Sequence, residues 1–189
     1  MSLPAETIWI IARATGVASL VALSLSILTG MAMRPKTLGW LSTNRAISEL
    51  HSYATVLWLP LALAHMIALL FDSFAKVGVL DLIIPFLMPY GTFAIGLGTV
   101  SAELLVVVLV AAWSRDSLSR GQWLAFHQLS YFAFGAAFLH GVLSGTDLAY
   151  PWLAGVAWLV AAILALAGVR RVRHALGATA AVRVDRTAA

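Results

Sequence analysis

Long apolar stretches alternate with short polar connections along almost the whole chain. A helix that crosses the hydrocarbon core of a bilayer needs about 20 largely apolar residues, because an α-helix rises about 1.5 Å per residue. The stretches that meet this requirement are residues 7–33, 47–71, 92–113, 122–144 and 151–169. The pattern therefore predicts an all-α integral membrane protein with five transmembrane helices that form a bundle.

The connection between the second and third stretches is apolar but irregular. Residues 72–91 contain Pro85, Pro89 and Gly91, which interrupt a spanning helix. We expect residues 77–90 to form an amphipathic segment that lies in the outer interface of the membrane. If this segment is helical, it is a sixth helix of the bundle.

Composition supports the membrane assignment and limits the domain organisation. Hydrophobic residues make up 61% of the chain and charged residues only 11%, which is unusual for a soluble domain. We expect a transmembrane helical domain at 1–170 and a short basic cytoplasmic tail at 171–189 that is disordered. We expect neither a soluble catalytic domain nor a nucleic-acid-binding surface, since the basic residues form no folded basic face.

The basic residues predict the orientation in the membrane. The connections 34–46 and 114–121 and the chain from residue 170 onwards hold ten lysines and arginines, whereas the connections 72–91 and 145–150 hold only Lys76. Because cytoplasmic loops carry an excess of lysine and arginine, we expect the N-terminus outside and the C-terminus in the cytoplasm. The expected location is the cell membrane, either plasma or inner.

Four histidines lie inside the predicted spans, His51 and His65 on the second and His127 and His140 on the fourth. These two spans run in the same direction, so His51 is level with His127 near the cytoplasmic face, and His65 is level with His140 near the outer face. The separations of 14 and 13 residues correspond to about 21 and 20 Å along a helix. A lone histidine in a span is explained by an interhelical hydrogen bond, but two level pairs predict two planar metal cofactors.

The type of cofactor follows from the available ligands. The chain has no cysteine, which excludes thiolate metal sites, iron–sulfur clusters and covalent c-type haem attachment. Zinc and copper prefer compact sites, whereas two facing imidazoles in a flat apolar slot suit the iron of a haem. The histidines are therefore predicted to be the axial ligands of two haems.

The angular positions of the histidines agree with this prediction on one helix only. His51 and His65 lie within about 40° of each other on an ideal helix, but His127 and His140 lie about 140° apart. This difference requires local overwinding, a bend or different side-chain rotamers. Gly135 is one site for such a bend, and Gly141 is another.

The pairs His-x13-His and His-x12-His, the segment "ARATG" and the segment "FHQLSYFAFGAAFLHGVLSGTD" resemble the ferric reductase-like transmembrane domain family. This family includes NADPH oxidases, ferric reductases and the haem-binding membrane subunit of the bacterial methionine sulfoxide reductase system. The resemblance covers residues 9–168 and implies two haems b that pass electrons across the membrane. It assigns the inner haem to His51 and His127 and the outer haem to His65 and His140. The chain departs from the oxidases and ferric reductases because it has a short basic tail in place of their flavin and nicotinamide domain.

Other residues inside the spans have several interpretations. Arg13 is predicted to bind the propionates of the outer haem; alternatively, it extends to the outer interface. Glu103 is a proton-transfer group, a quinone contact, a partner of Arg13 or a protonated core carboxyl. Trp58 and Phe134 lie midway between the two histidine levels and either bridge the electron path or pack as ordinary core residues.

Three functional classes are consistent with the sequence. The first is transmembrane electron transfer by an oxidoreductase component, from a separate flavoprotein or quinol to an extracytoplasmic protein or a small molecule. The second is a haem-bearing membrane anchor subunit of a quinone-linked oxidoreductase complex. The third is a non-redox membrane protein whose histidines bind a metal ion for transport. Membrane lipid is a partner in all three, and we assign no catalytic residue.

Overall fold

The computed structural model describes residues 4–33, 45–145 and 150–187, with side chains described as far as residue 170. The described residues form long α-helices and two short 3-10 turns, and no strand occurs among them. The helices are α1 (Ala5–Ala32), α3 (Arg45–Phe71), α4 (Thr92–Trp113), α5 (Arg120–Ser144) and α6 (Pro151–Thr187). The 3-10 turns are η1 (Leu80–Leu82) and η2 (Arg115–Ser117).

These helices agree with the predicted spans, and their hydropathy supports a multi-pass membrane protein. Helices α1, α3, α4 and the Pro151–Arg170 part of α6 are long and apolar enough to cross a bilayer. Helix α5 is 25 residues long but is not among them. Its hydropathy is lowered by polar side chains, which include His127, Gln128, Ser130 and His140. The all-α fold is confirmed, whereas membrane crossing by α5 stays a prediction.

The C-terminal helix is longer than the predicted span. Helix α6 continues without interruption to Thr187 and so includes most of the tail that we expected to be disordered. The sequence after residue 170 is rich in alanine and arginine, both strong helix formers, and has no proline. Local propensity therefore favours continuation of the helix beyond the apolar stretch.

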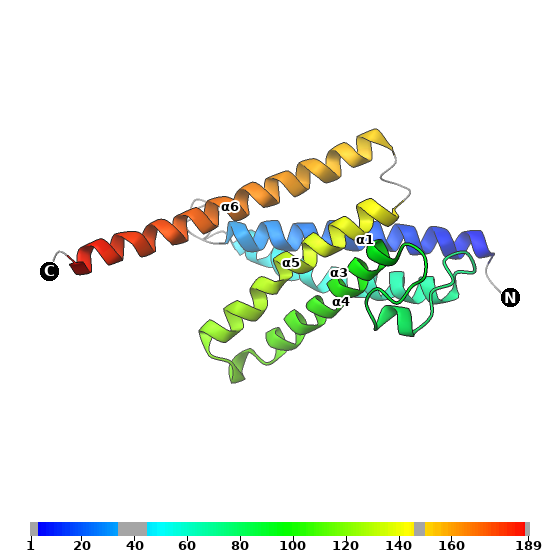
Figure 1. Ribbon diagram of the computed structural model, residues 1–189, viewed down its shortest axis with the longest axis horizontal. Helices are drawn as coiled ribbons and strands as arrows, with labels where there is room; N and C mark the ends of the chain where they lie inside the picture. The colour runs from blue at the N-terminus through cyan, green and yellow to red at the C-terminus, as the bar shows by residue number, and fades with distance from the viewer. Residues whose placement is uncertain (1–3, 34–44, 146–149, 188–189) are drawn as a thin grey trace.

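The helices are arranged as two antiparallel pairs and one outer helix (Figure 1). Helix α3 runs beside α1, and α5 runs beside α4, so α3 and α5 point in the same direction. The α4–α5 pair lies obliquely to α1, and α6 extends past the end of the bundle. A central apolar core joins the helices; its buried residues are Ala22, Leu23, Ile27, Met31, Trp58, Leu105, Ala133, Phe134, Phe138 and Leu164.

The connection at 72–91 folds back against α4 without forming a long helix. The hydroxyl of Thr99 donates a hydrogen bond to the carbonyl oxygen of Asp81 over 3.0 Å. The ring of Phe86 packs directly on Gly96, so closely that no side chain would fit at that glycine. Several apolar side chains of the connection remain exposed, which suits a position in the membrane interface: Val79, Leu80, Ile83, Ile84 and Leu87.

The alternative of a sixth helix at 77–90 is wrong, because only the three-residue turn η1 forms there. Pro85 and Pro89 cannot donate main-chain hydrogen bonds within a helix, and Phe86 between them has a φ of 64°. Desolvation, with smaller contributions from the Asp72 and Asp81 carboxylates, raises the pKa of the Tyr90 phenol.

Candidate functional site

The four histidines of α3 and α5 meet as two pairs. The ring centroids of His51 and His127 are 6.4 Å apart, and those of His65 and His140 are also 6.4 Å apart. A metal–imidazole bond is about 2.0–2.1 Å long and the ring centroid lies about 1.2 Å behind the ligating nitrogen, so imidazoles on opposite sides of one metal ion have centroids about 6.4 Å apart. Both pairs therefore have the separation that a shared metal ion requires.

The pairing follows from the directions of the helices. Because α3 and α5 point the same way (Figure 1), the first histidine of one faces the first histidine of the other. The 13-residue spacing on α5 is met within a single continuous helix. We attribute this to the oblique orientation of the α4–α5 pair, because the side of an obliquely crossing helix that faces its neighbour changes from one level to the next. His127 and His140 then face α3 from different angular positions.

The imidazoles of His51, His65 and His140 each donate an Nδ1–H hydrogen bond to a main-chain carbonyl oxygen of a neighbouring helix. The bonds are His51 to Ser26 (2.8 Å), His65 to Ala12 (2.7 Å) and His140 to Ala94 (2.8 Å). A neutral imidazole that carries its proton on Nδ1 has its lone pair on Nε2. These bonds thus hold three rings in the tautomer that binds a metal through Nε2, as carbonyl partners of metal-bound histidines commonly do.

The fourth imidazole, His127, is stacked on an aromatic ring. The Trp123 indole lies 5.0 Å from it, centroid to centroid, with 12° between the planes. The two residues are four positions apart on α5 and therefore share a face of the helix. The guanidinium of Arg115 lies 4.8 Å from the Trp123 ring on the side of the α4–α5 connection. Trp123 is thus in contact with a candidate ligand.

The histidines occur as pairs and not as larger clusters. Among the residues whose positions are described, no three histidines, aspartates or glutamates lie close enough together to share a metal ion. The donor set at each pair is therefore two imidazoles. This set suits a metal whose remaining positions are filled by a planar ligand, and it does not make a closed tetrahedral site by itself.

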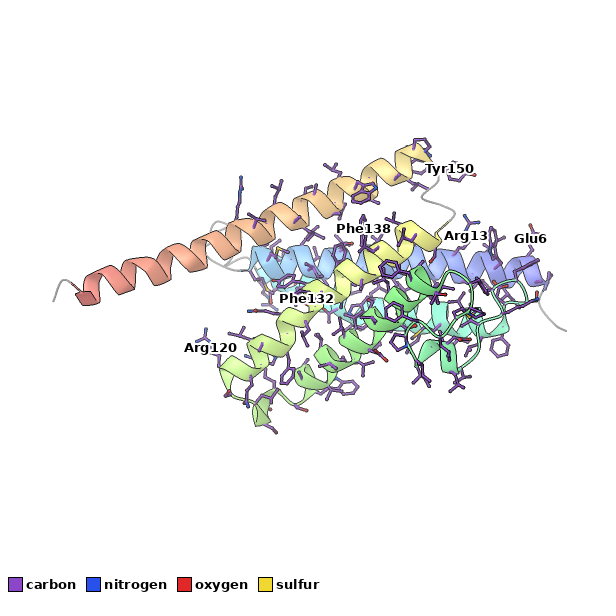
Figure 2. All side chains as sticks on the ribbon, viewed as in Figure 1. Glu6, Arg13, Arg120, Phe132, Phe138 and Tyr150 are labelled. Atoms are coloured by element: carbon purple, nitrogen blue, oxygen red, sulfur yellow. The ribbon has the colours of Figure 1, made fainter. Side chains whose placement is uncertain are left out.

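Arg13 lies at the same end of the bundle as the pair of His65 and His140. It directly follows Ala12, whose carbonyl oxygen accepts the hydrogen bond of His65. Its side chain is half-buried, and its guanidinium carbon lies 4.0 Å from the Trp9 ring centroid. Figure 2 shows Arg13 towards one end of the helix bundle and Arg120 towards the opposite end of the bundle. Arg13 is therefore placed near the outer pair, and its contact with propionates stays a prediction.

If the pair of His65 and His140 holds a haem, as the sequence predicts, replacing Arg13 with alanine is expected to lower the reduction potential of that haem, because a nearby cation disfavours the more positive ferric state. The expected shift is on the order of tens of millivolts, since the group is half-buried and partly screened. A spectroscopic redox titration of the purified protein measures it, with Arg120→Ala as the control at the opposite end. A shift of the inner haem alone would contradict the assignment of Arg13.

Glu103 lies away from the imidazole pairs. The side chains of Ser101 and Leu105 are buried, and Glu103, two positions from each, is exposed on the opposite face of α4. Within the described part of the chain Glu103 forms no ion pair with Arg13. The hypothesis that Glu103 is the partner of Arg13 thus has no support in the structure.

The region between the two pairs is apolar and closely packed. Trp58 and Phe134 each have 8% of their surface exposed and belong to the central core. Phe134 also stacks on Phe138, with 6.1 Å between ring centroids. The two aromatic side chains predicted between the histidine levels are therefore buried in the central core.

Comparison of the chain with protein-family models, with curated proteins and with solved structures finds no match. The function proposed below is accordingly supported by the geometry of the imidazole pairs and by the membrane character of the helices.

Proposed function

We propose that each imidazole pair holds one haem b and that the chain transfers electrons across the membrane. The observation that carries this proposal is the 6.4 Å separation found in both pairs. When bound, haem supplies one-electron oxidation and reduction at its iron. The imidazoles would occupy both axial positions, and the Nδ1–H bonds to carbonyl oxygens would fix the orientation of three of them.

The positions of the pairs suit transfer across a bilayer. The histidines of α3 are 14 residues apart and those of α5 are 13 apart, which places the two levels about 20 Å from each other along the helices. A bilayer core is about 30 Å thick, so each level lies near one face. The buried core between the levels would exclude water and ions and so keep electron transfer separate from ion leakage.

The donor and acceptor are proposed to be separate molecules. With the N-terminus outside, the pair of His51 and His127 faces the cytoplasm, where a flavoprotein or quinol would supply electrons. The acceptor at the outer face would be an extracytoplasmic protein or a small molecule. Trp123 and Arg115 extend from His127 towards the cytoplasmic connection and lie on the expected side for a donor.

A cavity between helices favours a second candidate, the haem-bearing anchor subunit of a quinone-linked complex. An apolar cavity of about 590 Å³, partly open to the surroundings, lies between α1, α5 and α6. Tyr131, one helical turn from His127, lines it together with Phe134, Phe138 and Trp158. The cavity is large and apolar enough for part of a quinone, and its polar phenol lies near the inner pair.

Reconstituted vesicles distinguish these candidates. Purified holoprotein is placed in liposomes that contain trapped ferricyanide, and dithionite is added outside. Transmembrane transfer predicts that the ferricyanide is consumed faster than in protein-free liposomes. Haem reduction by an added quinol, with ferricyanide loss at the protein-free rate, would instead favour the anchor subunit and contradict the first proposal.

A further inference from the structure

Three of the four paired imidazoles lie against a glycine of the neighbouring helix. A Cβ added at Gly16 would lie 2.9 Å from Nδ1 of His65. One added at Gly98 would lie 2.8 Å from Nδ1 of His140, and one added at Gly30 would lie 3.1 Å from Cε1 of His51. Carbon atoms of side chains almost never approach other atoms within 3.0 Å. An alanine at either of the first two positions would therefore displace the imidazole ring, and one at the third would press on it.

Each of these glycines lies four residues after the carbonyl group that the same imidazole contacts. The pairs are Ala12 with Gly16, Ser26 with Gly30, and Ala94 with Gly98. In an α-helix, the carbonyl of residue i points towards residue i+4, and the side chain of i+4 tilts back over it. Glycine at i+4 leaves the second lone pair of that carbonyl open to an imidazole N–H. We call each carbonyl and glycine combination an imidazole seat.

The seats repeat with the spacing of the histidines that they hold. The two seats on α1 are 14 residues apart, from Ala12 to Ser26, and His51 and His65 on α3 are also 14 residues apart. The third seat is on α4 and holds His140 of α5. His127 is not among the nearest contacts of any described glycine and is stacked on Trp123 instead. Among the described residues, two of these seats serve the outer pair and one serves the inner pair.

We propose that Gly16, Gly30 and Gly98 are positioning residues that fix the planes of the axial imidazoles and hold the two rings of each pair nearly perpendicular. The observed angles between ring planes are 75° in the inner pair and 70° in the outer pair. The inference rests on the proposed function, because the rings become axial ligands only when haem is bound. Each seat fixes one ring through a hydrogen bond on its Nδ1 edge and steric contact along the same edge.

The angle between axial imidazoles has a direct spectroscopic consequence. In low-spin ferric haem, nearly perpendicular imidazole planes give a more anisotropic electron paramagnetic resonance signal, with a higher largest g value, than parallel planes do. A methyl group in a seat turns or shifts one ring and therefore changes the largest g value of the haem that this ring serves. A glycine with only a general packing role would leave this value unchanged as long as the protein folds.

The test compares Gly16→Ala, Gly98→Ala and Gly30→Ala with Gly135→Ala in purified holoprotein. Gly135 is a matched control, since it lies inside α5 and a Cβ there would contact nothing within 4 Å. The first two variants are expected to shift the largest g value of the outer haem, or to lose that haem, and to leave the inner haem unchanged. Gly30→Ala is expected to shift only the inner haem and by a smaller amount, because its added Cβ lies farther from the ring.

The same spectra separate failure of this inference from failure of the proposed function. If the wild-type protein has two low-spin haems and the three variants match Gly135→Ala, the imidazole seats are overturned and the haem assignment stands. If the wild-type protein binds no haem, the proposed function fails and the inference fails with it. If Gly16→Ala and Gly98→Ala do not accumulate as folded protein, the largest g value of Gly30→Ala still tests the inference. The added Cβ at Gly30 requires the smallest adjustment, because its contact with the ring is 3.1 Å.

Discussion

Replacing His65 or His140 with alanine is expected to remove one and the same haem, the outer one, and so to halve the haem content. The two rings face each other at 6.4 Å and would ligate one iron from opposite sides, so loss of either leaves a single axial imidazole. A haem b has no covalent link to the chain, which has no cysteine. The inner pair should keep its haem, because its two histidines lie about four helical turns away.

Redox titrations of the four single histidine variants provide the measurement. His51→Ala and His127→Ala form the matched second set, which should lose the other spectral component. The two components are expected to differ in potential, because charge, exposure and hydrogen bonding differ at the two ends. If His65→Ala and His127→Ala abolished the same component, the pairing and the shared direction of α3 and α5 would both be contradicted.

The sequence predicted the helices and the histidine levels because both depend on distance along the chain. A run of about 20 apolar residues defines a span whatever its neighbours are, and the 14-residue spacing of His51 and His65 converts directly into depth. Distance along the chain could not predict how His127 and His140, about 140° apart around an ideal helix, are both directed towards α3. Their direction depends on how obliquely α5 approaches α3, which is set by packing between helices.

The imidazole seats could not be assigned from sequence for a related reason. Gly16 and Gly98 are two of 14 glycines in the chain, and nothing local separates them from Gly135, which touches no imidazole. The useful signal is a pair of glycines on α1, Gly16 and Gly30, with the same 14-residue spacing as the histidines of α3. That signal becomes informative only when α1 is known to lie beside α3.

The extent of α6 beyond the predicted span has a different cause. Hydropathy marks the apolar part of a helix, and it ends near Arg170, where the arginines begin. Helix propensity does not end there, since alanine and arginine both favour helix. At this end of the chain the helix is therefore longer than its apolar part, whereas the prediction assumed that both end at the same place.

The holoprotein is expected to contain two haems per chain, both six-coordinate and low-spin. Each imidazole pair would supply both axial ligands of one haem, so neither iron would keep an open position for oxygen or carbon monoxide. This property separates an electron-transfer protein from an oxygen-binding one, and it separates haem from a transported metal ion, which would give no haem spectrum. This expectation rests on the proposed haem binding by the two imidazole pairs and does not depend on the donor or the acceptor.

The most direct test of this account is the haem content and carbon monoxide response of the purified wild-type protein. A pyridine haemochrome assay against protein concentration should give two haems b per chain, and the reduced spectrum should not change when carbon monoxide is added. One haem per chain, no haem, or a high-spin spectrum that shifts with carbon monoxide would contradict the assignment of two imidazole pairs to two haems.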